Sequence, residues 1–206
     1  MTQDQPKRRT QRERRARSER QIIRAAADLF AEQGFLRTTL NQIGSAAGYT
    51  GGLVSHRFGS KEGLLQAVVE QMGSRFRDEQ LNEALHAARA VESLERLIEV
   101  YLNEVVVREK RIRTLYVVVG AALAAVPEIR DGVKALNEAA REMLVNLIER
   151  GQQESVFRKD VDAKDAACAA LGILRGVVMQ YLADSDAVDL SAQSPLIKDM
   201  VIRGLS

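Results

Sequence analysis

Residues 39–61 read TLNQIGSAAGYTGGLVSHRFGSK and predict two short helices that meet at a glycine. Thr39, followed three residues later by Gln42, has the pattern of a capping box that begins a helix. Gly48 suits the left-handed backbone of a sharp turn, and Thr50 can cap the helix that follows. The stretch therefore predicts a helix-turn-helix.

The second of these helices has an inward and an outward face. Val54 and Phe58 lie four residues apart and point toward the core. In a helix-turn-helix the second helix enters the major groove of double-stranded DNA. The residues that we predict to contact DNA are Thr39, Thr50, Gly51, Gly52, Ser55, His56, Arg57 and Lys61. The alternative is an ordinary helical hairpin in which glycine serves only packing.

Some of these residues are expected to contact phosphates and others to contact bases. Thr39 and Lys61 are expected at phosphates. Arg57 is the predicted base reader, because a bidentate contact between arginine and guanine contributes about 1–3 kcal/mol of discrimination. Gly51 and Gly52 each cost roughly 1 kcal/mol of helix stability against alanine, and we expect them to let the backbone approach phosphate or base closely.

Residues 18–65 resemble the amino-terminal domain of the TetR family of bacterial transcriptional regulators. The matching positions are Phe30, Gly34-Phe35, Thr38-Thr39, Ala47-Gly48 and Phe58-Gly59-Ser60-Lys61-Glu62-Gly63-Leu64. The family usually ends its recognition helix in Tyr-x-His-Phe, whereas Ser55-His56-Arg57-Phe58 stands here. A smaller hydroxyl therefore replaces a phosphate-touching tyrosine, and arginine replaces histidine.

This resemblance implies a transcriptional repressor that a small-molecule effector releases from a palindromic operator. It also implies a homodimer formed through the last two long helices, which pair as a four-helix bundle across the axis. A second hypothesis is a DNA-binding protein of the same fold that has no small-molecule effector and is controlled by a protein partner. An enzyme is a distant third, and no cofactor is expected.

The composition predicts an all-α protein, because the 206 residues are 46% hydrophobic, contain no tryptophan and show few runs typical of strands. The net charge of +2 is unevenly distributed. Residues 1–63 contain 12 basic and 6 acidic side chains, and the rest contain 18 and 22. A polyanionic partner is therefore expected for the first part. The single cysteine fits a reducing cytoplasm, and we expect no membrane contact.

Three parts are predicted along the chain: a disordered basic arm over 1–17, a helix-turn-helix domain over 18–65, and a helical ligand-binding and dimerisation domain over 66–206. In the first helix, Ser18 is expected to cap the start and Gly34 to mark the end. The later helices are expected over about 60–76, 93–110, 112–126, 127–151, 163–182 and 196–205, with a broken helix over 77–90. Ser194-Pro195 is expected to open the last one.

The carboxy-terminal part is predicted to hold both an effector pocket and the dimer interface. The pocket residues are Phe76, Tyr101, Tyr116, Met143 and Met179, which together form the mostly apolar lining of a ligand site. The alternative is that they simply fill the core. We expect an apolar or amphipathic effector with little net charge, because no cluster of arginine or lysine falls on the inward faces. Ala170, Leu174 and Met200 are expected at the dimer interface.

Catalytic chemistry has little support in the sequence. His56 and His86 are the only histidines, and no metal-ligand spacing surrounds them. Cys168 lies on an alanine-rich stretch and is expected to be a small buried hydrophobic residue. The aspartates at 160, 162 and 165 lack the loop of a calcium site, and Asp162 is expected to cap a helix.

Overall fold

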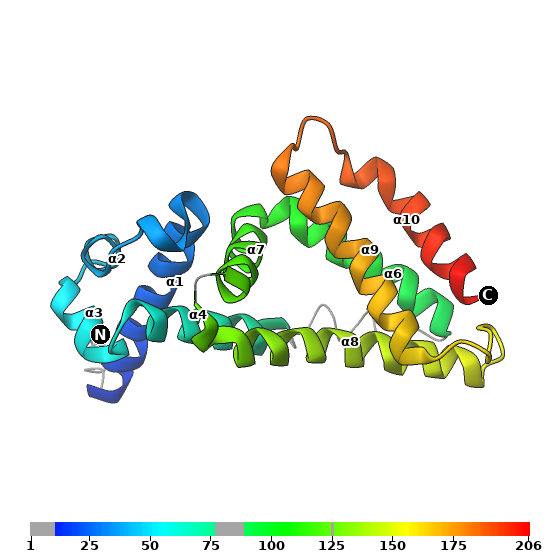
Figure 1. Ribbon diagram of the computed structural model, residues 1–206, viewed down its shortest axis with the longest axis horizontal. Coiled ribbons are helices and arrows are strands. Elements are labelled where there is room, and N and C mark those ends of the chain that lie inside the picture. Colours follow the sequence, from blue (N-terminus) through cyan, green and yellow to red (C-terminus); the bar gives the residue numbers. More distant parts are fainter. Residues whose placement is uncertain (1–10, 77–88, 125) are drawn as a thin grey trace, which may run out of the picture.

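The computed structural model describes residues 11–76, 89–124 and 126–206, with side chains for all of these except 73–76. In these ranges the secondary structure is helical, without a strand, which confirms the all-α prediction. The helix predicted over 77–90 lies almost entirely outside the described residues. In Figure 1 the first four helices gather at one end of an elongated molecule, and the later helices form a bundle at the other.

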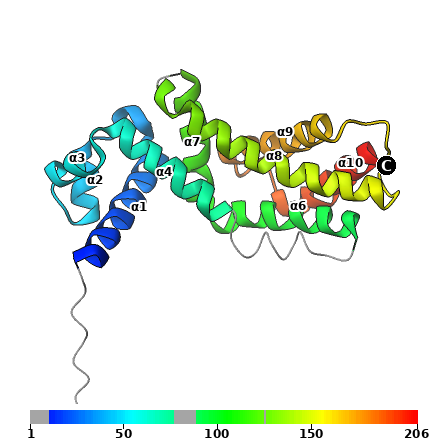
Figure 2. The ribbon, with the colours of Figure 1, turned by 90° about the horizontal axis from the view of Figure 1, so that it is seen from below.

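The amino-terminal unit consists of α1 (Gln11–Arg37), α2 (Leu40–Ala47), α3 (Gly51–Phe58) and α4 (Lys61–Phe76). As predicted, α1 breaks at Gly34, whose φ of 79° is left-handed. Phe35 then folds back, so that its ring centroid lies 5.5 Å from that of Phe30. The α4 helix continues from this unit toward the bundle (Figure 2).

The start of α1 differs from the prediction. Residues 11–17, expected in a disordered arm, are helical, and residues 1–10 lie outside the described ranges. Ser18 therefore lies inside the helix, where its hydroxyl donates to the carbonyls of Arg14 and Arg15. The physical reason is that arginine, glutamate, glutamine and alanine are good helix formers, and Arg15 pairs with Glu19 one turn later.

The carboxy-terminal bundle follows the predicted order closely. Its elements are α6 (Ala90–Val107), α7 (Glu109–Ala124), the 3₁₀ turn η1 (Pro127–Ile129), α8 (Arg130–Gln153), α9 (Ala163–Ala183) and α10 (Leu190–Leu205). Asp162 caps α9 as expected, by accepting from the backbone N–H groups of residues 164 and 165. The last helix begins earlier than expected, because Asp189 caps it in the same way. Pro195 therefore lies inside α10 and does not open it.

Two apolar cores hold these elements together. One is formed by α6, α9, α10 and the later part of α8. The other joins α1 to α4 with α7, η1 and the first turns of α8. Val68 of α4 and Val118 of α7 are both buried in this second core, so the packing of the amino-terminal unit continues beyond residue 65 into α7.

Candidate nucleic-acid interface

The helix-turn-helix forms through the predicted local interactions. The N–H of Gln42 donates to Thr39 Oγ1 at 3.2 Å, and Thr39 N–H donates to Gln42 Oε1 at 2.8 Å, which completes the capping box. Gly48 ends α2 with a left-handed φ of 78°. Thr50 Oγ1 accepts from Leu53 N–H at 3.2 Å and begins α3. Each of these contacts spans at most three residues, which explains why the sequence pattern predicts them.

Glycine lets α2 and α3 approach each other closely. A Cβ on Gly44 would lie 2.8 Å from Gly51 N and 2.8 Å from the carbonyl carbon of Thr50. A Cβ on Gly51 would collide with the side chain of Asn41. Gly51 therefore serves the packing of the two helices, which corrects the expectation that it faces DNA. Gly52 is exposed, and a Cβ there would approach only Thr50 Oγ1, at 3.9 Å, as an outward position requires.

The outward face of α3 is exposed where the sequence predicts it. Thr50, Gly52, Ser55 and His56 are all exposed, whereas Val54 is fully buried and Phe58 is half-buried against the same core. Thr39 is also exposed, at the start of α2. Five of the eight predicted DNA contacts therefore share one accessible end of the molecule.

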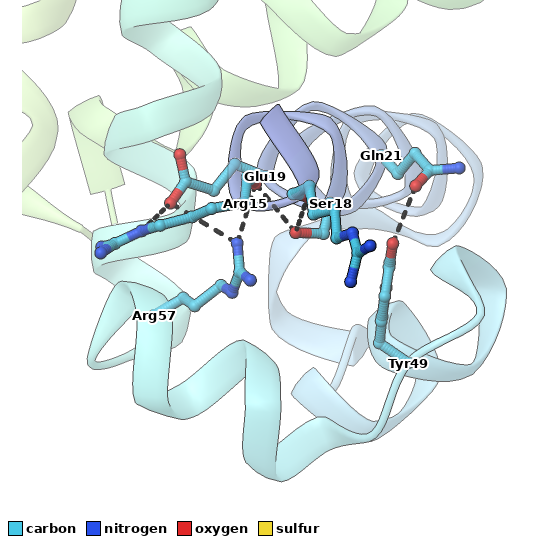
Figure 3. Close-up of polar contacts among 7 residues, drawn as sticks. Arg15, Ser18, Glu19, Gln21, Tyr49 and Arg57 are labelled. Carbon is cyan, nitrogen blue, oxygen red and sulfur yellow. Dashed lines mark hydrogen bonds and ion pairs between the residues drawn. The ribbon is translucent and has the colours of Figure 1, made fainter. Parts of the chain in front are cut away.

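Arg57 does not belong to this outward face. Its guanidinium donates to the carbonyl oxygen of Arg15 at 3.0 Å and lies 3.5 Å from Glu19 Oε1 (Figure 3). The side chain is only 16% exposed. The predicted base reader instead fastens α3 to the first turns of α1. The Arg15 carbonyl belongs to the helical extension of α1, which the sequence analysis placed in a disordered arm, whereas Glu19 lies within the predicted first helix.

Lys61 is likewise committed within the protein. Its ammonium group donates to the carbonyls of Phe35, Leu36 and Thr38 at 2.9, 3.3 and 3.0 Å. It also lies 4.3 Å from the centroid of the Phe35 ring. A cation at the end of a helix is favourable because it satisfies carbonyls that have no partner in the helix. Lys61 thus stabilises the end of α1, in place of the phosphate contact that was predicted.

Two arginines of α1 lie at the same end of the molecule and were missed as specific contacts. A hollow of about 580 Å³ is lined by Arg14, Arg17, Gln21, Ala47, Gly48 and Tyr49. Tyr49 donates to Gln21 Oε1 at 2.8 Å and so holds the turn of the helix-turn-helix against α1 (Figure 3). Both arginines are exposed. Their basic run was visible in the sequence, but only a helical α1 places them beside the turn.

The predicted effector residues do not all meet in one place. Tyr101, Tyr116 and Met143 are partly buried against the bundle core, whereas Met179 is 58% exposed on the surface of α9. Met179 is therefore not a pocket residue, because it lies on the outer face of its helix. Phe76 belongs to α4, but its side chain lies outside the described ones.

Tyr101 and Tyr116 belong to a polar cluster inside the bundle. Tyr116 donates to the carbonyl oxygen of Arg175 at 2.7 Å, and the Arg175 guanidinium donates to Asn137 Oδ1 at 2.6 Å. The hydroxyls of Tyr101 and Tyr116 lie close together without the geometry of a hydrogen bond. Burial raises the pKa of both phenols, so both stay protonated. The sequence analysis found no cluster of arginine or lysine on the inward faces, and a single arginine, Arg175, takes part in this polar cluster.

The three residues predicted at the dimer interface differ in their exposure. Ala170 and Leu174 are each only 4% exposed and lie in the core of the single chain, so they are not available to a partner. Met200 is 54% exposed on α10.

Cys168 is exposed, contrary to the expectation of a buried thiol. Among the residues that the structure describes, no group of three or more histidine, cysteine, aspartate or glutamate side chains is placed to hold a metal ion.

Comparison with known proteins covers both halves of the chain. Residues 22–68 match the family described as bacterial regulatory proteins, tetR family, and residues 90–205 match the family described as BetI-type transcriptional repressor, C-terminal. The regulator TtgR of Pseudomonas putida is 29% identical over 185 residues, which are 82% of each chain.

Two solved structures share the fold. A transcriptional regulator from Saccharomonospora viridis in complex with choline has a TM-score of 0.82 at 23% identity, covering 92% of this chain and 98% of that one. The fatty acid degradation regulator FadR from Bacillus halodurans has a TM-score of 0.78 at 21% identity, covering 90% and 94%.

Proposed function

This chain belongs to the TetR family of bacterial regulatory proteins, and we propose that it represses transcription by binding a pseudo-palindromic operator as a homodimer until a small molecule releases it. The observation that carries the proposal is the exposed outer face of α3 on a complete helix-turn-helix. In this division of work, α1 to α4 read DNA, and the carboxy-terminal bundle dimerises and binds the effector.

Base reading is assigned to the outer face of α3. Thr50, Ser55 and His56 present hydroxyl and imidazole groups that can bond to base edges in the major groove. Gly52, which is exposed and carries no side chain, allows the helix backbone to come close to the groove wall. Thr39 stands at the start of α2, where its hydroxyl can reach a phosphate.

Phosphate contacts are assigned to Arg14 and Arg17. Both are exposed beside the turn between α2 and α3. When α3 lies in the major groove, the phosphate backbone of the duplex can therefore lie against them. Each arginine at a phosphate releases condensed counterions, which makes affinity fall with salt. Such contacts position the protein without reading sequence.

The homodimer is assigned to the outer faces of α9 and α10, which lie side by side (Figure 1). The apolar composition of α9 is that of a membrane-spanning helix, yet only 28% of its most apolar window is buried in the single chain. Gly172 and Gly176 have open space around them, and Leu196 and Met200 are 59% and 54% exposed on α10. A second copy of the same surface covers these residues across a two-fold axis.

Effector release is supported by the relatives. A similar regulator from Saccharomonospora viridis forms a complex with choline, and the similar protein SmeT forms a complex with triclosan. An alternative is control by a protein partner without a small molecule. Thermal shift against a compound library separates the two, because a ligand that binds only the folded state raises the melting temperature.

The proposal is tested by selecting duplexes from a random library and measuring their affinity by fluorescence anisotropy. We expect a two-fold related pair of half-sites, with His56→Ala changing the selected sequence. Arg14→Ala with Arg17→Ala should weaken all sequences alike and reduce the salt slope by about 2, roughly one per phosphate contact. Arg20→Ala is the matched control, since Arg20 is exposed on α1 but does not line the hollow. An unchanged selection with His56→Ala would refute the assignment of α3.

A further inference from the structure

Four helices of the bundle each contribute one side chain to the polar cluster around Arg175. Tyr101 comes from α6, Tyr116 from α7, Asn137 from α8 and Arg175 from α9. Tyr116 is anchored by its bond to the Arg175 carbonyl, and Asn137 is anchored by the guanidinium. The cluster is thus held by contacts between helices of the bundle.

The charge of Arg175 has no counter-ion in the described part of the chain. No carboxylate there lies within 4.0 Å of its guanidinium, whose hydrogen-bond partner is the neutral amide of Asn137. Arg175 is half-buried. Removing a cation from water without a paired anion is unfavourable, so the site favours an anion that arrives from outside.

A second donor points to the same kind of ligand. The Tyr101 hydroxyl is buried and makes no hydrogen bond with a described residue. A buried hydroxyl without a partner costs free energy, which an acceptor atom beside Tyr101 and Arg175 would recover. Tyr101 and Tyr116 themselves pack against the apolar core of the bundle. The surroundings therefore suit a molecule with one anionic group and an apolar body.

We propose that Arg175 and Tyr101 form the anion-binding end of the effector site, and that the effector is an amphipathic carboxylate. This inference rests on the proposed release by a small molecule and replaces the expectation of an effector with little net charge. Asn137 is a positioning residue, because it acts by orienting the guanidinium. Arg175, Asn137 and Tyr116 are only partly buried, so the cluster is reachable from solvent.

The test uses three probes with the same ten-carbon chain and different head groups: decanoate, 1-decanol and decyltrimethylammonium. Their dissociation constants are measured by isothermal titration calorimetry on the full-length protein. A hydrogen bond to a charged group contributes about 1.5–3 kcal/mol, so decanoate should bind about 10- to 100-fold more tightly than 1-decanol. The cationic probe should bind most weakly.

Variants locate the preference at the cluster. Arg175→Gln should abolish the preference for decanoate, and Arg175→Lys should retain part of it. Asn137→Asp keeps the cation but supplies an internal carboxylate, so it should also remove the preference. Arg158→Gln is the matched control, because Arg158 is a surface arginine paired with Asp160 outside the bundle core. Circular dichroism establishes that each variant is folded.

The outcomes separate this inference from the proposed function. Equal binding of decanoate and 1-decanol, no binding of any probe, or a preference that survives Arg175→Gln would each overturn the anion site. If decanoate binds through Arg175 but leaves operator affinity unchanged, the anion site stands and its role as the effector site fails. If a neutral compound releases the operator while decanoate does not bind, the proposed function stands and the anion site falls.

Discussion

Arg57 has the outward sequence position of a base reader but the contacts of a structural residue. Its two partners lie on α1, 42 and 38 positions earlier in the chain, at the Arg15 carbonyl and the Glu19 carboxylate. Arg57→Ala should therefore lower the free energy of unfolding by about 1–2 kcal/mol, as expected for a partly exposed hydrogen bond to a charged group. Because α3 would lose its tie to α1, operator affinity should fall for all sequences alike.

Chemical denaturation and selection from a random duplex library measure these two effects. His56→Ala is the comparison, since His56 is exposed on the same helix and should alter sequence preference with little change in stability. If Arg57→Ala instead relaxed the preference at one base of each half-site, Arg57 would leave α1 and read DNA directly.

Gly44 gives a second prediction at the scale of one residue. Its missing Cβ leaves room for the backbone of Tyr49, Thr50 and Gly51, and the atoms in the way belong to the main chain. Overpacking costs about 1–3 kcal/mol and alanine adds roughly 1 kcal/mol to helix propensity, so Gly44→Ala should destabilise the protein by up to about 2 kcal/mol. Thermal unfolding followed by circular dichroism measures the change.

Gly52→Ala is the matched control for this substitution, since the nearest atom to its new Cβ is Thr50 Oγ1 at 3.9 Å. It should raise stability by up to about 1 kcal/mol while weakening operator binding. Equal stability of the two alanine variants would mean that α2 and α3 separate without cost.

Among residues, the sequence predicts what is local and misses what is distant. The caps at Thr39, Thr50 and Asp162 each depend on neighbours within three residues, so a short pattern contains all the necessary information. The contacts of Arg57 and Lys61 reach back more than 20 residues to α1. Their positions could not be predicted without knowing where α1 begins and how it crosses α3 and α4.

At the scale of helices, α9 and α10 carry the proposed dimer surface. Leu196→Glu with Met200→Glu should convert the dimer into a monomer at micromolar concentration, because charged residues would be placed opposite each other at a two-fold axis without partners. The mass is measured by size-exclusion chromatography with light scattering. Since two half-sites are read together, operator affinity should fall as well.

Leu123→Glu is the control for this change, because Leu123 is 76% exposed on α7, away from the outer faces of α9 and α10. This variant should remain a dimer. A dimer of unchanged stability in the Leu196 and Met200 variant would move the interface to another surface.

Helix periodicity predicts which face of α9 is apolar but not which partner covers each side. Ala170 and Leu174, four residues apart on one face, pack inside the chain, whereas Met179 lies on another apolar face of the same helix and stays exposed. The assignment depends on the crossing of α8 over α9, which no local pattern encodes. The same limit applies to α10, where the Asp189 cap acts before the Ser194-Pro195 pair.

For the whole molecule, α7 connects the bundle to the DNA-reading unit. Tyr116 of α7 reaches the polar cluster at Arg175, and two residues earlier Thr114 donates to the Ala27 carbonyl of α1 at 3.0 Å. Val118 of the same helix is buried in the core of the amino-terminal unit. We therefore expect a movement of α7 at the cluster to reach α1 through these contacts, in addition to any route along α4.

This connection predicts that operator DNA and α7 influence each other. Allosteric coupling is reciprocal, so operator binding should slow hydrogen exchange of the amides in residues 109–124, measured by mass spectrometry. Thr114→Val keeps the shape of the side chain but removes its buried hydrogen bond to α1, and should abolish that slowing while operator affinity changes little.

Lys110→Gln is the matched control one turn away. Its ion pair with Glu32 is exposed, and exposed pairs contribute about 0–1 kcal/mol, so this variant should keep the protection of α7. If α7 is protected equally in Thr114→Val, the signal passes along α4, and the bond between Thr114 and Ala27 serves only to hold the two units together.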